Sequence, residues 1–395
     1  MASLAQKYQK KTDQEHVLDN PDTYIGSVEN IQQSLYLFED DRIVEKCVPY
    51  NPGLFKLFDE GIVNCRDHYI RMKQNPSGEP VTQIHVTIEN GTITMYNNGN
   101  GIDVEKHPTH NIWIPELIFG HLRTSTNYDK EEKKITGGKN GFGFKLVLIW
   151  STYGKIETID HIRKLKYIQE FHDNLKIIQK PKITKNSGKP YTRVSFTPDY
   201  KRLGVPCLSE HMISLFRRRV YDIGGITPKD VKVKFNQESI KCNDFKSYIH
   251  MYLNEEEKKQ MVFEQINERW SVAAVLSPEY KQVSFVNGIH TSKGGKHVEY
   301  ILNQITKKMI TYITQKKKIQ VKPAIIKEQL LLFVNCSIEN PSFDSQTKDY
   351  LNTSVSKFGS TCEITSSMID KLAKMGVLNT SCLLYTSPSP RDFQV

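Results

Sequence analysis

The sequence has no apolar run that could cross a membrane. A spanning helix needs about 20 predominantly apolar residues, whereas the longest runs here are of the kind seen at Leu330–Val334. The opening segment Met1–Lys7 has no apolar core of signal-peptide length. The seven cysteines are widely spaced and form no Cys-x-x-Cys pair, which argues against a disulfide framework and against a zinc site. We therefore expect an intracellular protein with reduced thiols and no membrane partner.

The composition is that of an ordinary globular protein with a moderate excess of basic residues. Hydrophobic residues make up 38% of the 395 residues and charged residues 25%, which excludes a mainly disordered chain. At about 150 residues per domain, this length suggests two or three domains. Lysine and arginine number 54 against 44 acidic residues, which gives a net charge of +10. This charge permits a polyanionic partner such as nucleic acid but does not require one.

Hydrophobic patterning predicts both strands and helices. Alternating apolar residues over 82–96 flank Asn90-Gly91 and predict a hairpin. Further strands are expected at 192–196 and 231–235, and helices at 52–70, 208–222, 296–318 and 365–376. Because the order shows no regular βαβ rhythm, we expect an α+β protein whose mixed sheet is covered on one face. The charged segment 255–259 predicts a solvated helix or loop near a domain boundary, and 380–395 predicts a disordered end.

The predicted helix over 52–70 carries a line of polar side chains beside its apolar face. Glu60, Asn64 and His68 are four residues apart and fall along one ridge at about 100° per residue. An ordinary amphipathic helix whose polar side faces water is one interpretation. A functional ridge is the other, because these short polar groups border the apolar arc and do not oppose it.

Two glycine clusters follow, and each could hold a phosphate. Asn97–Ile102 comes after the hairpin, and Gly137–Lys145 comes before the apolar run Leu146–Trp150. Glycine lets the backbone approach a ligand closely, and exposed backbone amides bind anions. The second cluster is not a P-loop, because Phe144 stands where that motif needs lysine. Two plain turns are the alternative explanation.

This order of motifs resembles the GHKL ATPases, and more narrowly the eukaryotic and viral type of DNA topoisomerase II (type IIA). The resemblance runs from about residue 6 to about residue 377 and includes five further segments: Glu15–Val28, Leu117–Gly120, Thr124–Tyr128, Phe285–Ile289 and Asn340–Lys348. It implies an α+β chain with a GHKL (Bergerat) ATPase sandwich and a smaller α/β transducer domain of ribosomal-S5-like type. The expected division is an arm at 1–28, an ATP-binding domain at 29–245, a transducer at 246–378 and a disordered or non-native tail at 379–395.

The resemblance also implies roles for individual residues. Glu60 would be the general base that activates water against the γ-phosphate of ATP, and Asn64 would ligate Mg²⁺. Asn98 would read the adenine, and Lys348 would stabilise charge on the γ-phosphate. The full set expected at the nucleotide is Tyr8, Asn64, His68, Asn98, Gly101, Ile102, Ser125, Thr126, Asn127, Gly138, Lys139, Asn140, Gly141, Phe142, Gly143, Phe144, Lys145, Gln346, Thr347 and Lys348.

Partner contacts are implied as well. Tyr8–Thr12 resembles an arm that reaches a second subunit, so an ATP-linked homodimer is expected, with a frayed terminus as the alternative. Lys316, Lys317 and Lys318 occupy the place of a basic loop that faces double-stranded DNA without reading bases, or they form a solvated helix end. Arg217–Arg219 looks equally basic, and we interpret it as structural and surface-exposed.

Two departures from the family pattern stand out. His68 replaces a usual asparagine, and its protonation could make nucleotide affinity depend on pH. Asp19-Asn20 replaces a usual Leu-Arg, which suggests a viral or protistan lineage. The resemblance therefore implies the nucleus for a cellular eukaryotic protein and the cytoplasm of the infected cell for a viral one.

The function implied is the ATP-hydrolysing N-terminal gate of a type II topoisomerase, which dimerises on ATP to capture a DNA duplex. The match stops at the transducer, so the DNA-cleavage domains are expected to be absent from this chain. A nucleotide-triggered DNA clamp with little hydrolysis is the alternative. The related histidine kinases are disfavoured, because no helix with a phospho-acceptor histidine precedes the ATP site.

Overall fold

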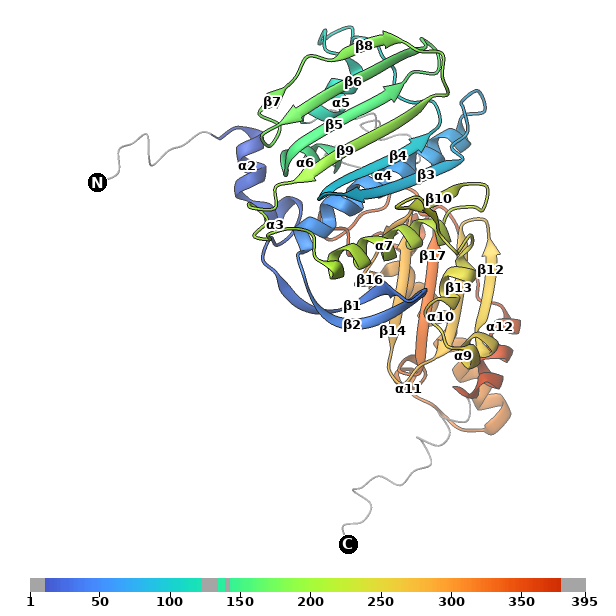
Figure 1. The fold of residues 1–395 in the computed structure, drawn as a ribbon. Helices are drawn as coiled ribbons and strands as arrows, with labels where there is room; N and C mark the ends of the chain where they lie inside the picture. The colour runs from blue at the N-terminus through green and yellow to red at the C-terminus, as the bar shows by residue number, and fades with distance from the viewer. Residues whose placement is uncertain (1–10, 123–133, 139–142, 378–395) are drawn as a thin grey trace. The chain divides into compact units, whose positions relative to one another are not determined.

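A computed structural model describes residues 11–122, 134–138 and 143–377. The chain divides into two compact units, Met1–Asp244 and Phe245–Val395, and each is described by itself (Figure 1). The sequence-based boundary near residue 245 falls beside this division. No helix in the described part of the chain is long and apolar enough to cross a membrane.

The first unit is built on a mixed sheet. Among the described residues this sheet has nine strands in the order β11-β10-β3-β4-β9-β5-β6-β7, with β8 paired to β6. The pair β10–β3 is parallel and the other pairs are antiparallel. The strands are β3 (Gln83–Glu89), β4 (Thr92–Asn98), β5 (Ser151–Ile159), β6 (Leu165–His172), β7 (Ile177–Ile178), β8 (Lys182–Lys185), β9 (Tyr191–Pro198), β10 (Lys232–Phe235) and β11 (Glu238–Ser239).

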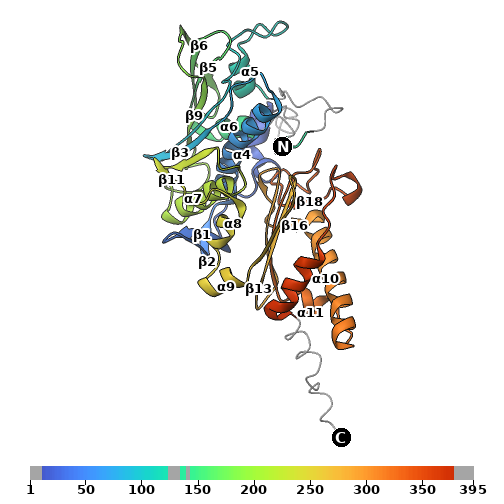
Figure 2. The same ribbon diagram turned by 90° about the vertical axis from the view of Figure 1, so that its right-hand side faces the viewer.

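Helices α4, α5 and α6 lie on one face of this sheet (Figure 2), which confirms the expected mixed sheet covered on one face. The helices of this unit are α2 (Asp13–Asp19), α3 (Pro21–Tyr24), α4 (Pro52–Gln74), α5 (Ile114–Gly120), α6 (Gly143–Ile149) and α7 (Glu210–Gly225). A separate hairpin precedes α4 and consists of β1 (Ile31–Glu39) and β2 (Arg42–Tyr50).

Helix α4 is the long central helix of the first unit. Asn51 caps it by accepting from the Leu54 amide at 2.9 Å, and Pro52 occupies its first turn, where a missing N–H costs nothing. Its apolar residues Leu54, Phe58 and Ile62 are fully buried. The helix approaches β4 so closely that a Cβ at Gly61 would clash with Met95 Sδ. The predicted helix over 52–70 is therefore confirmed, with one further turn.

The predicted hairpin is also confirmed, since β3 and β4 pair antiparallel from Ile84 opposite Asn97 to Glu89 opposite Thr92. Asn90 and Gly91 both have positive φ, +50° and +76°, as a two-residue turn that follows the strand twist requires.

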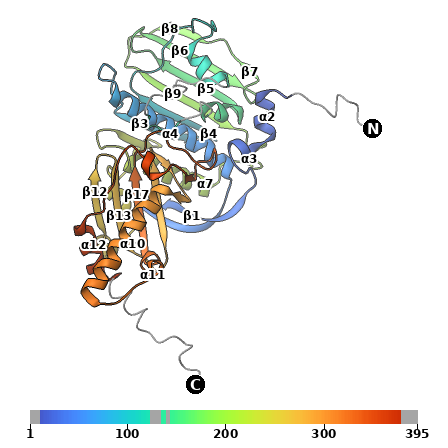
Figure 3. The same ribbon diagram turned by 180° about the vertical axis from the view of Figure 1, so that it is seen from behind.

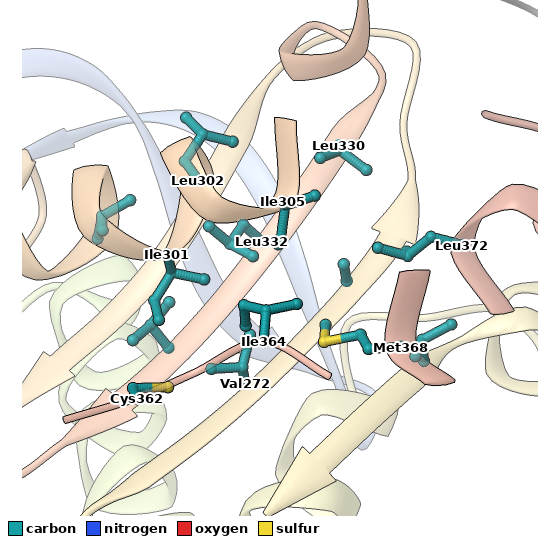
Figure 4. Packing of buried hydrophobic residues seen from close by; sticks show 14 of the residues in the cluster. Val272, Ile301, Leu302, Ile305, Leu330, Leu332, Cys362, Ile364, Met368 and Leu372 are labelled. Atoms are coloured by element: carbon teal, nitrogen blue, oxygen red, sulfur yellow. The ribbon is translucent and has the colours of Figure 1, made fainter. Parts of the chain in front are cut away.

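Among the described residues, the second unit contains a five-stranded sheet with α10, α11 and α12 on one side and α8 on the other (Figure 2). Its order is β12-β13-β17-β14-β15, and the parallel pair β14–β17 is joined through α10. Figure 3 shows α10 and α11 on one side of this sheet. Figure 4 shows the apolar contact between α10 and the sheet, where Ile301 and Ile305 of α10 meet Leu332 of β17. The elements are α8 (Phe245–His250), α9 (Glu255–Gln260), β12 (Val262–Asn267), β13 (Trp270–Leu276), β14 (Lys281–Val286), β15 (Ile289–His290), β16 (Gly294–Gly295), α10 (Lys296–Lys317), α11 (Pro323–Lys327), β17 (Leu330–Cys336), β18 (Tyr350–Leu351) and α12 (Ser366–Leu372).

Helix α9 confirms the solvated charged segment near the boundary. None of its residues is buried, and Asn254 and Glu257 form a reciprocal capping box at its start. The segment 380–395, expected to be disordered, lies outside the described residues.

The arginine run on α7 is structural, as expected, but the expectation that it is surface-exposed is wrong. Arg217 is half-buried, but Arg218 and Arg219 are 3% and 0% exposed. Arg219 donates from Nε to Asp59 Oδ1 at 2.7 Å, and Arg218 pairs with Asp222 at 3.3 Å. A guanidinium can be buried when carboxylates compensate its charge. Asp222 lies on the same helix, whereas Asp59 is 160 residues away, so the sequence around the three arginines does not reveal this second partner.

Candidate functional site

The polar ridge of α4 is not a solvated helix face. Glu60 is 4% exposed, and its Oε1 lies 2.9 Å from the ammonium of Lys56, one turn earlier. Asn64 donates from Nδ2 to the Glu60 carbonyl at 2.6 Å. Burial lowers the pKa of Lys56, but the carboxylates of Glu60 and Asp59 outweigh burial and raise it. Glu60 is thus a buried carboxylate held beside a protonated lysine.

Both glycine clusters meet this ridge. A Cβ at Gly143, where α6 begins, would clash with Glu60 Oε2 and lie 3.5 Å from Asn64 Nδ2. A Cβ at Gly99 would lie 2.6 Å from His68 Nε2. Glycine is needed at both positions for the backbone to approach α4. The structure therefore brings together the polar ridge and the two glycine clusters, which the sequence distributes between residues 60 and 145.

His68 has a buried Nε2 that finds no hydrogen-bond partner among the described residues. Such an orphaned polar atom is uncommon in folded proteins and fits a ligand group arriving from outside. Burial, with a smaller effect from Arg71, lowers the pKa of His68 to about 3. The imidazole is therefore neutral near pH 7, and the expected pH dependence through its protonation is not supported.

Gly101 and Ile102 hold the first glycine cluster against β5 through close packing and a hydrogen bond. Gly101 has φ +71° and packs against the Ile159 carbonyl, where a Cβ would clash, and the Ile102 amide donates to Thr158 Oγ1 at 3.0 Å. The cluster thus presents a fixed backbone beside the ridge.

The two adjacent asparagines of this cluster face opposite ways. Asn98 Oδ1 accepts from the Thr82 and Gln83 amides at 2.8 and 2.9 Å, so its side chain is engaged within the sheet. Asn97 is 6% exposed and shares the face of β4 with Met95, which packs on α4. This geometry does not support the adenine-reading role on Asn98 and favours Asn97. The strict alternation of the hairpin could have distinguished them.

Asp67 was not singled out from the sequence, yet it holds the start of the second cluster. Its Oδ1 and Oδ2 accept from the amides of Gly137 and Gly138, each at 2.8 Å. It is 1% exposed, and burial raises its pKa despite Arg71 and the two amides. The Gly138 amide, expected at phosphate, therefore donates to Asp67.

Replacing Asp67 with alanine should lower the free energy of unfolding by about 2–6 kcal/mol, because the buried Gly137 amide and the partly buried Gly138 amide lose their acceptor at about 1–3 kcal/mol each. Urea unfolding of the purified chain measures this change. Glu29→Ala, which removes an exposed carboxylate of the same unit, serves as the control and should stay within about 0.5 kcal/mol. Equal effects from both substitutions would contradict the role of Asp67.

Phe144 is placed differently from its expected role. Its ring packs edge-to-face against Phe119 and Phe196, with centroids 5.4 and 6.3 Å apart. The side chain belongs to the core, so only its backbone could serve a nucleotide. Next to it, Lys145 on α6 is 2% exposed, and burial lowers the pKa of its ammonium to about 8.

The remaining expected residues fall into two groups. Eight lie outside the described residues: Tyr8, Ser125, Thr126, Asn127, Lys139, Asn140, Gly141 and Phe142. Gln346, Thr347 and Lys348 lie in a loop of the second unit, so their approach to a nucleotide stays a prediction. Lys348 is 6% exposed and has φ +63°, which is unusual for lysine. Lys316–Lys318 are exposed at the end of α10.

A magnesium site is not preformed by acidic or histidine clusters. In the described part of the chain, no group of three or more His, Cys, Asp or Glu side chains could hold a metal ion. Mg²⁺ that accompanies a nucleotide usually takes one or two protein oxygens and completes its shell with phosphates and water. Because Asn64 Nδ2 is bonded to Glu60, its Oδ1 remains the group suited to that metal.

A helix that carries the buried Glu60, two glycine clusters beside it and a mixed sheet behind them define a GHKL-type ATPase. Consistent with this, the family described as histidine kinase-, DNA gyrase B-, and HSP90-like ATPase matches residues 50–202, and the DNA gyrase B family matches residues 244–379. The chain belongs to the DNA topoisomerase II family and corresponds to its ATPase region.

Individual relatives support this assignment. The DNA topoisomerase 2 of Acanthamoeba polyphaga mimivirus is 43% identical over 387 residues, which cover 95% of this chain and 30% of that protein. The Saccharomyces cerevisiae protein is 44% identical over 392 residues, covering 94% and 27%. This chain therefore spans less than a third of the length of these two relatives.

Solved structures agree in fold. The crystal structure of the ATPase region of Saccharomyces cerevisiae topoisomerase II has a TM-score of 0.90 at 43% identity and covers 98% of this chain and 100% of that one. The ATPase and transducer domains of DNA topoisomerase II from Balamuthia mandrillaris give 0.89 at 38%, covering 96% and 98%. The expected fold class is thus confirmed.

Proposed function

We propose that this chain binds ATP with Mg²⁺ and hydrolyses it as the N-terminal gate of a type II DNA topoisomerase. The observation that carries the proposal is the position of Glu60, a buried carboxylate directly beside the glycine at which α6 begins. A phosphate chain lying on the glycine backbone would place its last phosphorus near this carboxylate.

The residues divide the chemistry between them. Glu60 orients the attacking water and takes up its proton, as a carboxylate within hydrogen-bond reach can. Asn64 Oδ1 would hold Mg²⁺, which neutralises phosphate charge when bound. The neutral His68 donates a hydrogen bond from its Nε2, and the Lys145 ammonium pairs with the triphosphate. Asn97 is placed to bind the adenine amino group.

ATP affinity should fall as pH rises through about 8. A bound triphosphate stabilises the protonated form of Lys145, so binding is strongest below the pKa of about 8 that burial gives the free lysine. Calorimetric titration with ATP between pH 7.5 and 9.5 should show a decline of up to tenfold per pH unit above pH 8.

Lys145→Arg is the control for this titration, because arginine stays charged throughout the range. Its pH profile should be flat. A profile that keeps the same slope in Lys145→Arg would show that another group titrates.

We further propose that ATP closes a homodimer around double-stranded DNA, with Lys316–Lys318 contacting phosphates. Their exposure and the net charge of +10 support this partner. The topoisomerase names of the relatives support it as well. A nuclear location, or the infected-cell cytoplasm for a viral protein, remains a prediction.

Turnover measured with and without duplex DNA, combined with sedimentation in a non-hydrolysable ATP analogue, tests the gate. DNA-stimulated hydrolysis and analogue-induced dimers are expected. Dimers without hydrolysis would favour the nucleotide-triggered clamp, in which the neutral His68 binds phosphate but Glu60 does not promote hydrolysis of the bound ATP. A monomer that ignores the analogue would overturn dimerisation.

A further inference from the structure

A chain of alternating charges runs from Glu60 through the interior of the first unit to α7. Lys56 Nζ lies 2.9 Å from Glu60 Oε1 and 3.3 Å from Asp59 Oδ2. Asp59 Oδ1, the other oxygen of that carboxylate, accepts from Arg219 Nε at 2.7 Å. Beyond it, Asp222 Oδ2 lies 3.5 Å from Arg219 Nη1 and 3.3 Å from Arg218 Nη2.

We call this set the buried charge chain, and its net charge is zero. Its members, in order, are Glu60, Lys56, Asp59, Arg219, Asp222 and Arg218. It contains three cations and three anions, and the side chains in it are at most 9% exposed. Burying a charge is tolerable only when it is paired, so each member depends on its neighbours. Removing one charge would redistribute the pairing of all the others.

The geometry assigns a specific task to the middle of the chain. Lys56 stands between two carboxylates that compete for its ammonium, and it lies closer to Glu60. Arg219 occupies the far oxygen of Asp59 and shares its negative charge. Asp59 therefore anchors Lys56 without drawing it away from Glu60.

Apolar packing fixes the two helices that carry these groups. The rings of Phe58 on α4 and Phe216 on α7 stack with centroids 4.1 Å apart and planes 4° apart, next to the charge chain along both helices. Arg219 is fully buried. The reach of its guanidinium to Asp59 is thus set by packing and not by a mobile surface side chain.

We propose that Asp59 and Arg219 are positioning residues for hydrolysis: by fixing Lys56 they hold the Glu60 carboxylate in its productive orientation. This inference rests on the proposed ATPase function. Neither residue belongs to the predicted nucleotide-binding set, so their loss should reduce kcat and leave KM unchanged. A small displacement of a catalytic group can reduce turnover by about 10²-fold.

Asp59→Asn is the variant of choice, because asparagine keeps the shape and can still accept from Arg219. It should lower kcat by about 10–100-fold with KM within about twofold. Arg217→Gln is the matched control, since this neighbouring arginine on α7 pairs with the exposed Glu238 and does not belong to the buried charge chain. It should keep parental kcat, and thermal unfolding should show that both variants are folded.

The decisive measurement is a double-mutant cycle with Lys56→Met. If Asp59 acts through Lys56, then Asp59→Asn has no further effect on kcat once Lys56 is methionine. An equal loss in both backgrounds would reflect a merely structural role and would overturn the proposal, as would an unchanged kcat in Asp59→Asn.

Glu60→Gln separates this inference from the function on which it depends. If Glu60→Gln abolishes turnover while Asp59→Asn does not, only the positioning role is refuted. If Glu60→Gln retains full turnover, another group serves as the base, and the positioning role fails while ATP hydrolysis stands. If the unsubstituted protein shows no ATP turnover at all, the proposed function itself fails.

Discussion

Glu60→Gln should reduce kcat for ATP hydrolysis by about 10²–10⁴-fold, the usual contribution of a positioned general base. Glutamine keeps the size of the side chain but cannot accept the proton of the attacking water. ATP should still bind, because the predicted phosphate contacts come from the glycine backbone, His68 and Lys145. Phosphate release and equilibrium binding of labelled ATP measure the two quantities separately.

Glu89→Gln provides the control for this experiment. Glu89 is an exposed carboxylate at the end of β3, opposite Thr92 beside the turn of the β3–β4 hairpin. Its kcat should equal that of the parent protein. Turnover in Glu60→Gln equal to that of Glu89→Gln would show that another group serves as the base.

Lys348→Ala should have the second largest effect, a fall in kcat of about 10²–10³-fold, which is the cost of removing one donor that stabilises developing charge. Lys348 is buried and holds φ +63°, in a loop where its amide donates to the Ser345 carbonyl at 3.2 Å. A non-glycine residue in this strained conformation is usually fixed by its surroundings for a functional reason.

Lys357→Ala is the matched control, since Lys357 is an exposed lysine of the same unit. Single-turnover kinetics distinguish the chemical step from ATP binding and product release. If both substitutions leave the chemical step unchanged, Lys348 does not act on the γ-phosphate.

Local patterns predicted the elements that depend on local physics. The turn at Asn90-Gly91 follows from the positive φ that these two residues tolerate, and α4 follows from the spacing of its apolar residues. The proximity of Glu60 to Gly143 came from the resemblance, because nothing in the spacing of 83 residues states that two segments touch.

Burial and pairing were the properties that the sequence concealed. The helical spacing of Lys56, Asp59 and Glu60 is typical of a solvated face, and their buried partner Arg219 lies 160 residues from Asp59. The same is true of His68, whose pKa is lowered mainly by its enclosure and to a smaller extent by Arg71. Asn97 is the exception, since the alternation of β4 already indicated which asparagine faces inward.

The neutrality of the buried charge chain has a consequence for sequence variation. A neutral residue at position 59 leaves the Arg219 guanidinium short of one partner, and a neutral residue at position 219 removes the 2.7 Å contact of the Asp59 carboxylate, with Lys56, 3.3 Å away, still beside it. Either change alone is costly, whereas the paired change restores balance. Substitutions at positions 59 and 219 should therefore appear together among homologues, as covarying columns of an alignment.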